Sequence, residues 1–223
     1  MQTLEGAVIA CAGLGSRLGM GMPKCMIEID GVTLLSRLIH ALQPLVPRIH
    51  VVVGYREELI IEHCSRHHRD VVLVRNPDFR TTNTAHSIRL GSVGMEHRVL
   101  YLDGDLIIDP ASLRAFVKAT ETVPLLIGVT RAKSTQAVFV STDGVGDAVN
   151  LVSAFHRDPA TAWEWANVFA GPPQLLASGT RYVYECIEPL LPAAARALEL
   201  FEVDTPEDLE QAQAGIAAFA AAG

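Results

Sequence analysis

The residues best suited to chemistry lie in a glycine-rich loop after an apolar segment near the start of the chain. Residues 8–29 read VIACAGLGSRLGMGMPKCMIEI, with glycines at positions 13, 15, 19 and 21. Glycines let a backbone come close to an oxyanion. Arg17 and Lys24 add two cations to the same segment. A triphosphate requires this combination, so the loop indicates a protein that handles nucleotides.

Three glycine-loop patterns compete for this segment, and two of them fail. The dinucleotide fingerprint requires G-x-G-x-x-G and an acidic residue at the end of the second strand. Here Leu18 stands at the third glycine position, and the second predicted strand runs into Gly-Tyr-Arg at 54–56. The P-loop requires Gly-Lys-Ser/Thr at the start of a helix, whereas Lys24 lies between Pro23 and Cys25. The remaining pattern, G-x-G-[ST]-R-[LM] followed by Pro-Lys, matches throughout.

With this loop the chain resembles the nucleotidyltransferases that activate sugar phosphates, choline phosphate and related small acids. Residues 13–18 and the Pro-Lys pair at 23–24 match the signature of that family. Three further pieces follow in the family's order: Asn-Pro at 76–77 leading to Asn-Thr-Ala-His-Ser at 83–87, Leu-Asp-Gly-Asp at 102–105, and Glu-Val-Asp-Thr-Pro-Glu-Asp at 202–208. The resemblance covers nearly the whole chain.

The resemblance implies in-line attack by an acceptor phosphate or phosphonate oxygen on the α-phosphorus of a nucleoside triphosphate, with pyrophosphate leaving. The acceptor oxygen is already ionised at neutral pH, so no general base is needed. Catalysis is then expected to consist of positioning and charge neutralisation.

The same resemblance assigns roles to individual residues. Arg17 would contact the β- and γ-phosphates, and Lys24 would bridge the α-phosphate and the acceptor, although both could be exposed loop charges. Ala85 is small enough to let a planar base pass, and Thr84 could instead cap a helix. The expected nucleotide contacts are Ala12, Gly13, Leu14, Gly15, Ser16, Asn76, Thr84, Ala85, Ser87 and Asp103.

Asp105 and Asp204 are the expected ligands of Mg²⁺, the cofactor that this chemistry implies. Each ends a predicted strand, and the ends of parallel strands share one edge of a sheet, where two carboxylates can meet at one ion. Lys24, Arg17 and Asp105 are the expected catalytic residues. Asp103 is expected to be a helper or a turn residue. The alternative is that both aspartates are ordinary strand-end residues, with Asp204 serving the helix that follows.

The acceptor contacts are expected mainly from the middle of the chain. The candidates are His86, Arg131, Lys133, Glu164 and Asn167, with Arg157 and Trp165 beside them. Trp163 and Trp165 could form an aromatic cage for a quaternary ammonium group, although core packing is the more common use of tryptophan.

A separate group of histidines lies at 63, 67 and 68. His63 and His67 are spaced i and i+4, so a metal ion could bridge them on one helix face. No third ligand has the required spacing, so a solvated helix end is the preferred interpretation.

Composition narrows the class of protein. The chain has 223 residues, 49% of them hydrophobic, and a formal net charge of −7, which argues against a nucleic-acid partner. The four cysteines form no CxxC pair, as expected for reduced thiols in the cytoplasm. No run of eighteen apolar residues predicts a membrane span.

The elements that must position these residues alternate between strands and helices. Strands are predicted at 7–12, 49–53, 71–74 and 98–102, with helices at 34–42, 57–66 and 84–90. This order predicts an α/β, Rossmann-like, doubly wound and mostly parallel sheet. Strands at 125–130, 136–141 and 148–152, with an Asp-Gly turn at 143–144, predict a small antiparallel extension. A last strand at 197–203 precedes a helix capped by Thr205 and Asp208. The resemblance adds the nucleotide-diphospho-sugar transferase fold, as one domain over 1–223.

The residues at 83–87 resemble most the choline-phosphate cytidylyltransferase branch, which implies CTP as the nucleotide. The chain is also similar to the cytidylyltransferase domain of the bifunctional enzyme of the fosfomycin pathway. That resemblance implies 2-hydroxyethylphosphonate as the acceptor and a fused phosphonate mutase-like domain. Phosphocholine, 2-aminoethylphosphonate, inositol phosphate and a sugar 1-phosphate stay open as acceptors, and so does a non-catalytic nucleotide-sensing module.

Overall fold

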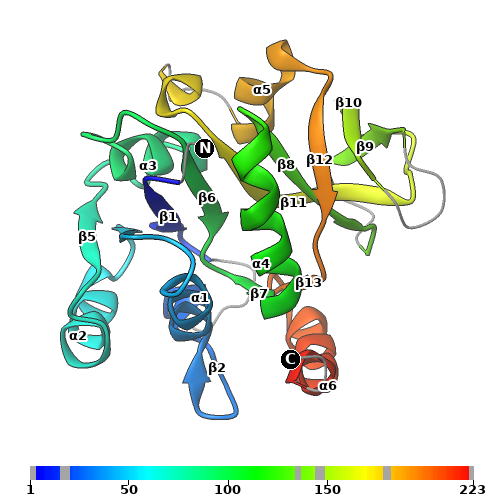
Figure 1. The fold of residues 1–223 in the computed structure, drawn as a ribbon. Helices are drawn as coiled ribbons and strands as arrows, with labels where there is room; N and C mark the ends of the chain where they lie inside the picture. Colours follow the sequence, from blue (N-terminus) through cyan, green and yellow to red (C-terminus); the bar gives the residue numbers. More distant parts are fainter. Residues whose placement is uncertain (1–3, 16–20, 134–136, 144–148, 178–181, 221–223) are drawn as a thin grey trace.

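A computed structural model describes residues 4–15, 21–133, 137–143, 149–177 and 182–220. A nine-stranded sheet, in the order β5-β4-β1-β6-β11-β8-β12-β10-β9, runs through the middle of the molecule (Figure 1). Its strands are β1 (Gly6–Cys11), β4 (Ile49–Val53), β5 (Val72–Arg75), β6 (Val99–Asp103), β8 (Leu126–Arg131), β9 (Phe139–Thr142), β10 (Leu151–His156), β11 (Trp163–Gly171) and β12 (Ala193–Ala197).

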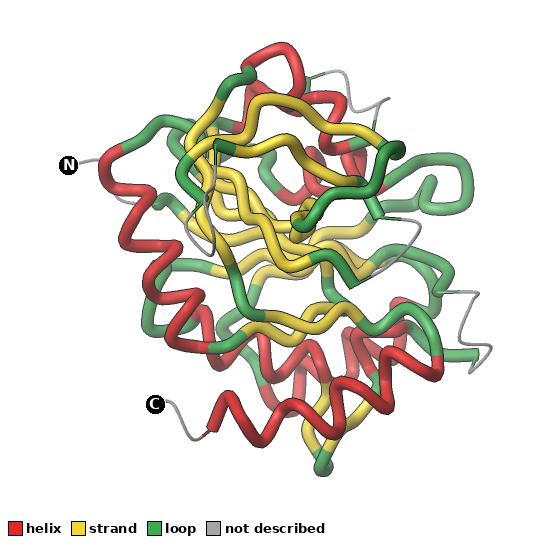
Figure 2. Tube along the Cα trace, turned by 90° about the vertical axis from the view of Figure 1, so that its right-hand side faces the viewer, coloured by secondary structure: helices red, strands yellow, loops and turns green. Residues whose placement is uncertain are grey.

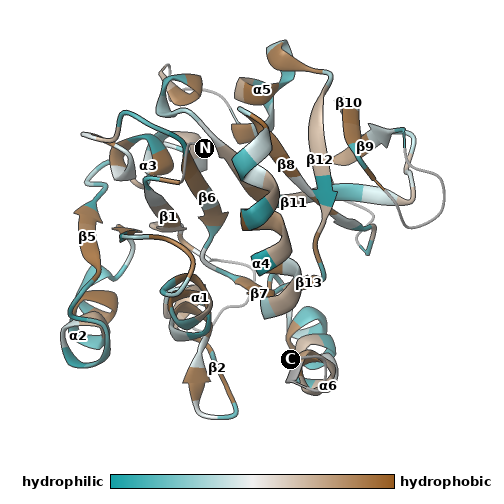
Figure 3. Cartoon of the chain, in the orientation of Figure 1, coloured by the Kyte–Doolittle hydropathy of each residue, from teal (hydrophilic) through white to brown (hydrophobic). Residues whose placement is uncertain are grey.

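The first four strands of this order form the parallel half of the sheet. β4 and β6 pair with β1 in parallel, and β5 continues the series beyond β4. All five residues of β4 are buried, as expected for a parallel strand with helices on both faces. The hydropathy colouring shows the same apolar character in β6 (Figure 3).

Helices cover both faces of the sheet (Figure 2). One face packs against α1 (Leu34–Leu42), α2 (Glu57–His67) and α4 (Pro110–Ala119), and the other against α3 (Thr84–Gly91) and α5 (Val183–Ile187). The C-terminal helix α6 (Pro206–Ala220) packs on a third apolar cluster with Ile27, Ile107 and Val203. The remaining elements are β2 (Glu28–Ile29), β3 (Val32–Thr33), β7 (Leu106–Ile108), β13 (Leu200–Glu202) and the 3₁₀ helices η2 (Lys24–Met26), η3 (Thr120–Thr122), η4 (Pro173–Leu176) and η5 (Glu188–Leu190).

The predicted doubly wound sheet is therefore present, and its extension is larger than expected and not purely antiparallel, because β12 pairs with β8 in parallel. β8, β12, β10, β9 and β11 pair in a closed series, because β9 also bonds back to β11. β9 and β10 are antiparallel neighbours, as the Asp-Gly signal predicted. The second strand begins at Leu151, and residues 144–148 of the predicted turn and strand lie outside the described residues. Asp143 Oδ1 accepts hydrogen bonds from the backbone N–H groups of Asn150 (3.2 Å) and Leu151 (2.9 Å), which ties the end of β9 to the start of β10.

The predicted last strand at 197–203 is present but shorter, because β13 spans only Leu200–Glu202, and Ala197 belongs to the preceding strand β12. β12 ends at Ala197 alongside β8, and β13 pairs antiparallel with β7 in a separate two-stranded sheet. Between β12 and β13 the chain leaves strand β8 and pairs with β7. Leu198, just after β12, still donates its N–H to Val129 O of β8 at 2.8 Å. This change carries the residues after β13 toward the end of β6.

Two general features complete the fold. All four cysteines are free thiols. Within the described ranges, no helix is long and apolar enough to cross a membrane.

Helix α3 is held unusually close to the sheet at its C-terminal end. A Cβ atom on Gly91 would lie 2.5 Å from Val8 Cγ1 and 2.6 Å from Val52 Cγ2. The absence of a side chain at this position therefore sets the distance between α3 and strands β1 and β4, and with it the placement of the N-terminus of α3.

We expect Gly91→Ala to lower the free energy of unfolding by about 1–3 kcal/mol through overpacking, although alanine is the better helix former. Ser65→Ala, at an exposed position of α2, is the control and should stay within about 0.5 kcal/mol of the parent. Urea denaturation of the parent and the two variants measures these free energies of unfolding. A Gly91→Ala protein as stable as the parent would contradict the close packing.

Candidate active site

A cavity of about 490 Å³ opens where β1 and β6 end, at the carboxyl edge of the parallel strands. Nucleotide-binding folds place their ligands at this edge. Seven of the ten predicted nucleotide contacts line the cavity: Ala12, Gly13, Leu14, Gly15, Thr84, Ser87 and Asp103. Lys24 and Asp105 line it as well. Ser16 and Arg17 lie outside the described residues.

Local backbone geometry brings the loop and Lys24 together. Gly15 has a positive φ of 58°, and a Cβ atom there would lie 3.0 Å from Lys24 Cγ. Glycine is thus required both for the backbone conformation and for the space that the lysine side chain occupies. Pro23, with φ −60°, immediately precedes the short helix η2 that Lys24 begins. The glycine and proline signals of the sequence therefore fix the origin of the Lys24 side chain.

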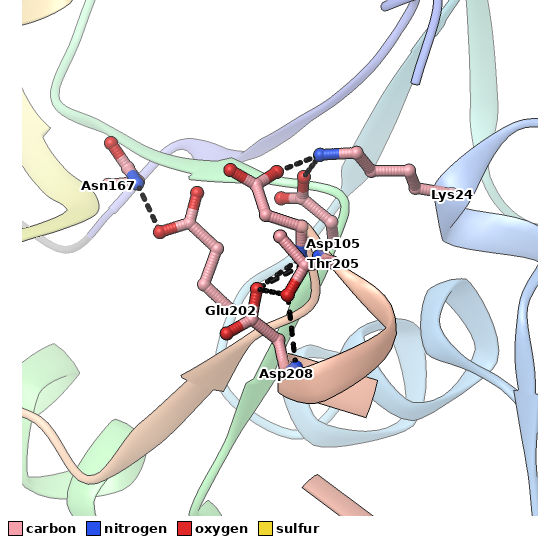
Figure 4. Close-up of polar contacts among 7 residues, drawn as sticks. Lys24, Asp105, Asn167, Glu202, Thr205 and Asp208 are labelled. Carbon is pink, nitrogen blue, oxygen red and sulfur yellow. Dashed lines mark hydrogen bonds and ion pairs between the residues drawn. The ribbon is translucent and has the colours of Figure 1, made fainter. Parts of the chain in front are cut away.

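The Lys24 ammonium group lies against two carboxylates from distant parts of the chain (Figure 4). Its Nζ is 3.0 Å from Asp105 Oδ2 and also donates to Asp204 Oδ1. Burial alone would lower the pKa of Lys24, but the charges of Asp105 and Asp204 outweigh it and raise the pKa above its usual value. Lys24 therefore acts as a fixed positive charge and not as a proton donor or base.

The predicted meeting of Asp105 and Asp204 is present, but through a different arrangement from the predicted one. Asp105 follows β6 and directly precedes β7, and Asp204 follows β13. The antiparallel pairing of β7 with β13, extended by a 3.0 Å bond from Val203 N–H to Asp105 O, brings them together. The sequence predicted that both aspartates would follow parallel strands. Instead, Asp204 follows β13, which is antiparallel to β7.

Glu202 lies beside these two aspartates. The sequence did not lead us to predict it as a site residue. Asp105, Glu202 and Asp204 each offer a carboxylate oxygen, and these oxygens lie within 4.8 Å of one another. We name these three residues the carboxylate cluster. The signal was available, because residues two apart at the end of a strand point to the same side.

The electrostatics of the carboxylate cluster favour a cation. Burial, followed by the charges of Asp105, Asp204 and Asp103, raises the pKa of Glu202 to about 9. Burial and the charge of Asp105 also raise the pKa of Asp103. Asp105 Oδ1 is buried and has no hydrogen-bond partner among the described residues. Closely spaced carboxylate oxygens with unmet bonding capacity fit a hard divalent ion such as Mg²⁺.

Asp204 is not needed as a helix cap. Thr205 and Asp208 form the predicted capping pair of α6, with Thr205 N–H donating to Asp208 Oδ2 at 2.9 Å and Asp208 N–H donating to Thr205 Oγ1 at 3.2 Å. The Asp204 carboxylate contacts Lys24 instead, while the Asp204 backbone N–H donates to Asp208 Oδ2 at 3.2 Å.

Around α3, the structure assigns the helix cap to another residue than Thr84 and places two of the predicted nucleotide contacts away from the cavity lining. The N-cap of α3 is Asn83, whose Oδ1 accepts from His86 N–H at 3.1 Å, and not Thr84. Ala85 is fully buried and lies behind the cavity wall. Asn76 is also buried, and its amide donates at 3.0 Å to both Thr82 Oγ1 and Ser87 Oγ. Asn76 therefore supports the cavity wall from behind and does not line the cavity.

A second cavity of about 680 Å³ lies on the other side of the carboxylate cluster. Lys133, Glu164 and Asn167, three of the predicted acceptor contacts, line it together with Glu202 and Asp204. Arg131 and His86 do not line either of the two cavities. The guanidinium of Arg131 stacks on another side chain, 4.2 Å from the ring centroid of Trp163.

The two tryptophans follow the packing interpretation and do not form a cage. Both are 7% exposed. The Trp163 ring faces Arg131, and Trp165 packs edge-on against Phe155 with ring centroids 5.5 Å apart. Trp165 also lines one wall of the second cavity.

Asn167 lies where the second cavity meets the carboxylate cluster. The register of β11 against β8 shifts between Trp165 and Phe169, and Asn167 within this bulge has a positive φ of 54°. A β-bulge re-aims side chains, and here the Asn167 Nδ2 atom donates to Glu202 Oε2 at 3.1 Å (Figure 4).

Three further residues that sequence reasoning missed line the first cavity: Phe79, Arg80 and Tyr182. Phe79 and Arg80 fall between the matched pieces at 76–77 and 83–87, where no motif points to them. Tyr182 is 59% exposed and stacks on Tyr184. No sequence pattern singles it out.

Comparison with known proteins agrees with this geometry. Residues 7–199 match the model of the MobA-like NTP transferase domain. A CMP-5'-(3-aminopropyl)phosphonate synthase from Streptomyces rubellomurinus is 33% identical over 121 residues, which are 52% of this chain and only 19% of that protein.

Solved structures share the fold over nearly the whole chain. The inositol-1-phosphate CTP transferase from T. maritima superposes with a TM-score of 0.79 at 18% identity, over 98% of this chain and 97% of that one. The CTP:phosphocholine cytidylyltransferase from Streptococcus pneumoniae gives 0.78 at 18% identity, over 96% and 100%. The predicted nucleotide-diphospho-sugar transferase fold is confirmed. The chain belongs to the family of MobA-like NTP transferase domains and is a nucleotidyltransferase.

Proposed function

We propose that this chain is a Mg²⁺-dependent cytidylyltransferase that transfers CMP from CTP to a small phosphonate or phosphomonoester and releases pyrophosphate. The observation that carries the proposal is the position of Lys24 and the carboxylate cluster between two cavities. The preferred acceptor is 2-hydroxyethylphosphonate, as the sequence resemblance implies.

The first cavity suits the nucleotide. The backbone of residues 12–15 lines it beside Lys24, so the triphosphate would lie against these backbone amides with its α-phosphate toward the ammonium group. Arg17 is assigned to the β- and γ-phosphates. Thr84 and Ser87, which line the same cavity, would face the remainder of the nucleotide.

The second cavity suits the acceptor, whose ionised oxygen would reach the α-phosphorus next to Lys24. The new bond joins the acceptor oxygen to the α-phosphorus, and the bond from that phosphorus to the bridging oxygen breaks. Pyrophosphate leaves with the electron pair, and no proton has to move. Lys24 lowers the barrier because its fixed charge lies where negative charge builds up.

The carboxylate cluster would hold Mg²⁺ through Asp105 and Asp204, with Glu202 beside them. A bound Mg²⁺ would supply further charge neutralisation on the phosphate oxygens. Lys24 contacts the same two aspartates and so stays next to the position where the α-phosphate would bind.

The identity of nucleotide and acceptor rests on the relatives and on the second cavity. The names of three similar proteins contain CTP or CMP, with a phosphonate, an inositol phosphate or phosphocholine as the other partner. These names support CTP and a small phosphorus acid. One observation favours a second candidate. The buried carboxylate of Glu164 lines the second cavity and would suit an acceptor with an ammonium group, such as an aminoalkylphosphonate.

A substrate panel tests the proposed reaction. We expect pyrophosphate release when CTP and Mg²⁺ are mixed with 2-hydroxyethylphosphonate, and less release with ATP, GTP or UTP. 2-Aminoethylphosphonate, phosphocholine and inositol 1-phosphate are the comparison acceptors. Tight CTP binding with no pyrophosphate released for any acceptor would contradict an enzyme and favour a nucleotide-sensing module.

Replacing Lys24 tests its role in the transition state. Lys24→Ala should reduce kcat by about 10²–10³-fold, the usual loss when one charge-stabilising group is removed, and leave the circular dichroism spectrum unchanged. Lys118→Ala, an exposed lysine on α4, removes the same charge far from the cavities and should keep full activity. A Lys24→Ala enzyme with near-normal turnover would refute this role.

The carboxylate cluster makes the metal-free protein less stable above acidic pH. The pKa of Glu202 is about 9 in the folded protein and about 4.5 when unfolded. Ionisation of Glu202 therefore favours the unfolded state, with a cost that begins near pH 4.5 and grows until about pH 9. Glu202→Gln removes this cost.

We expect Glu202→Gln in EDTA to raise Tm at pH 8 by roughly 2–4 °C, the shift for about 1 kcal/mol in a domain of this size. At pH 4.5 the difference should vanish. Mg²⁺ should raise the Tm of the parent more than that of the variant. Glu210→Gln, at an exposed position of α6, is the control. Equal Tm values for Glu202→Gln and the parent at pH 8 would show that the carboxylates do not repel one another.

A further inference from the structure

Two side chains at the first cavity have no role in the reaction proposed above. Phe79 and Arg80 line this cavity from the segment that joins β5 to α3 (Figure 1). The Arg80 guanidinium packs over the Phe79 ring, with its Cζ atom 5.2 Å from the ring centroid. Among the residues that the structure describes, no carboxylate or carbonyl oxygen accepts a hydrogen bond from it. Its N–H donors can therefore serve a ligand in the cavity.

Hydrogen bonds within this segment hold it in one shape. The buried side chain of Asn76 donates to Thr82 Oγ1 at 3.0 Å and accepts from the N–H of Asp78 at 3.0 Å. The N–H groups of Thr81 and Thr82 both donate to Asp78 O, at 3.0 Å and 3.1 Å. These bonds use the polar groups on either side of the aromatic ring and the guanidinium, which are left to line the cavity. A preorganised segment therefore presents the pair to a ligand.

Gly54, which follows β4, fixes where the segment meets the sheet. A Cβ atom on Gly54 would lie 2.8 Å from Phe79 Cβ and 3.0 Å from both Ala12 Cβ and Ala12 O. A side chain at this position would push Phe79 away from the start of the glycine-rich loop. Gly54 stands where a dinucleotide-binding strand would carry an acidic residue. Here it brings the aromatic ring and its guanidinium to the end of β4.

The strand order separates this pair from the reacting groups. β4 and β6 lie on either side of β1, so their ends are about 10 Å apart at the usual spacing of strands. Phe79 packs at the end of β4, whereas Asp105, which contacts Lys24, follows β6. With the α-phosphate next to Lys24, as the proposed function has it, the end of β4 is about one ribose away. The base of the nucleotide would lie there.

A guanidinium group can distinguish cytosine from uracil. Cytosine presents two adjacent acceptors, O2 and N3, and the planar fork of an arginine matches such a pair with two parallel N–H donors. Uracil carries a hydrogen on N3, so the same fork meets a donor there and loses one hydrogen bond. An aromatic ring below the guanidinium stabilises the cation and limits its orientation.

We propose that Arg80 selects cytosine by donating two hydrogen bonds to O2 and N3 of the base, and that Phe79 is a positioning residue that holds the guanidinium in the required orientation. The inference rests on the proposed function for the place of the α-phosphate. It supplies a physical reason, within this chain, for the use of CTP in place of UTP.

Calorimetric titration of the full chain with CTP or UTP, in Mg²⁺ and without an acceptor, tests the proposal. We expect the parent to bind CTP roughly tenfold or more tightly than UTP. Arg80→Gln and Arg80→Lys should both remove most of this preference, because lysine keeps the charge but not the paired donors. Phe79→Leu should reduce the preference by a smaller factor. Arg114→Gln, at an exposed arginine of α4, is the matched control and should keep the parent's preference.

A contact of Arg80 with the phosphates is the competing use of this side chain. In that case Arg80→Gln would weaken CTP and UTP by the same factor, and Arg80→Lys would restore both. That result, a parent without a preference for CTP, or an unchanged preference in Arg80→Gln would each overturn the proposal.

Pyrophosphate release, measured on the same proteins, separates this inference from the proposed function. Release with CTP and an acceptor, together with an unchanged preference in Arg80→Gln, would refute the role of Arg80 and leave the reaction standing. A lost preference in Arg80→Gln, with no release by the parent for any acceptor, would support the role of Arg80 and refute the reaction.

Discussion

The contact of Lys24 with Asp105 and Asp204 is the constraint on which the rest of the site depends. The three charges come from the loop after β1, the turn after β6 and the segment after β13. Each is partly removed from water, and burial of any one of them without the others would be costly. Their mutual attraction therefore offsets that cost and fixes three distant segments at one point between the two cavities.

Several features of the fold serve this contact. Gly15 and Pro23 set the start of the lysine side chain, the pairing of β7 with β13 places the aspartates, and the Thr205–Asp208 cap leaves the Asp204 carboxylate for the site. The same arrangement crowds Glu202 against two other carboxylates and raises its pKa. The proposed Mg²⁺ site would account for this loss of stability, because proteins often give up stability at functional positions.

Much of the fold and part of the site could be predicted from the sequence, because apolar runs and glycine or proline signals are local. The parallel strands, the helices between them, the glycine loop and the cap at Thr205 are of this kind. The break between β12 and β13 was missed because Leu198 and its neighbours read as one apolar segment, and the change of partner depends on β7. Glu202 could have been found from its two-residue spacing to Asp204, whereas the burial of His68 depends on tertiary packing, which alternation alone does not reveal. Asn76 and Ala85 were assigned to the site through a motif, although they support its wall from behind.

The central claim is that the acceptor attacks the α-phosphorus of CTP next to Lys24. It is tested most directly by incubating the enzyme, Mg²⁺ and a phosphonate acceptor with CTP labelled at either the α- or the γ-phosphorus. The account predicts that the α-label appears on the acceptor and the γ-label in pyrophosphate. A γ-label on the acceptor, or an α-label that leaves as free CMP or CDP without an acceptor adduct, would contradict it.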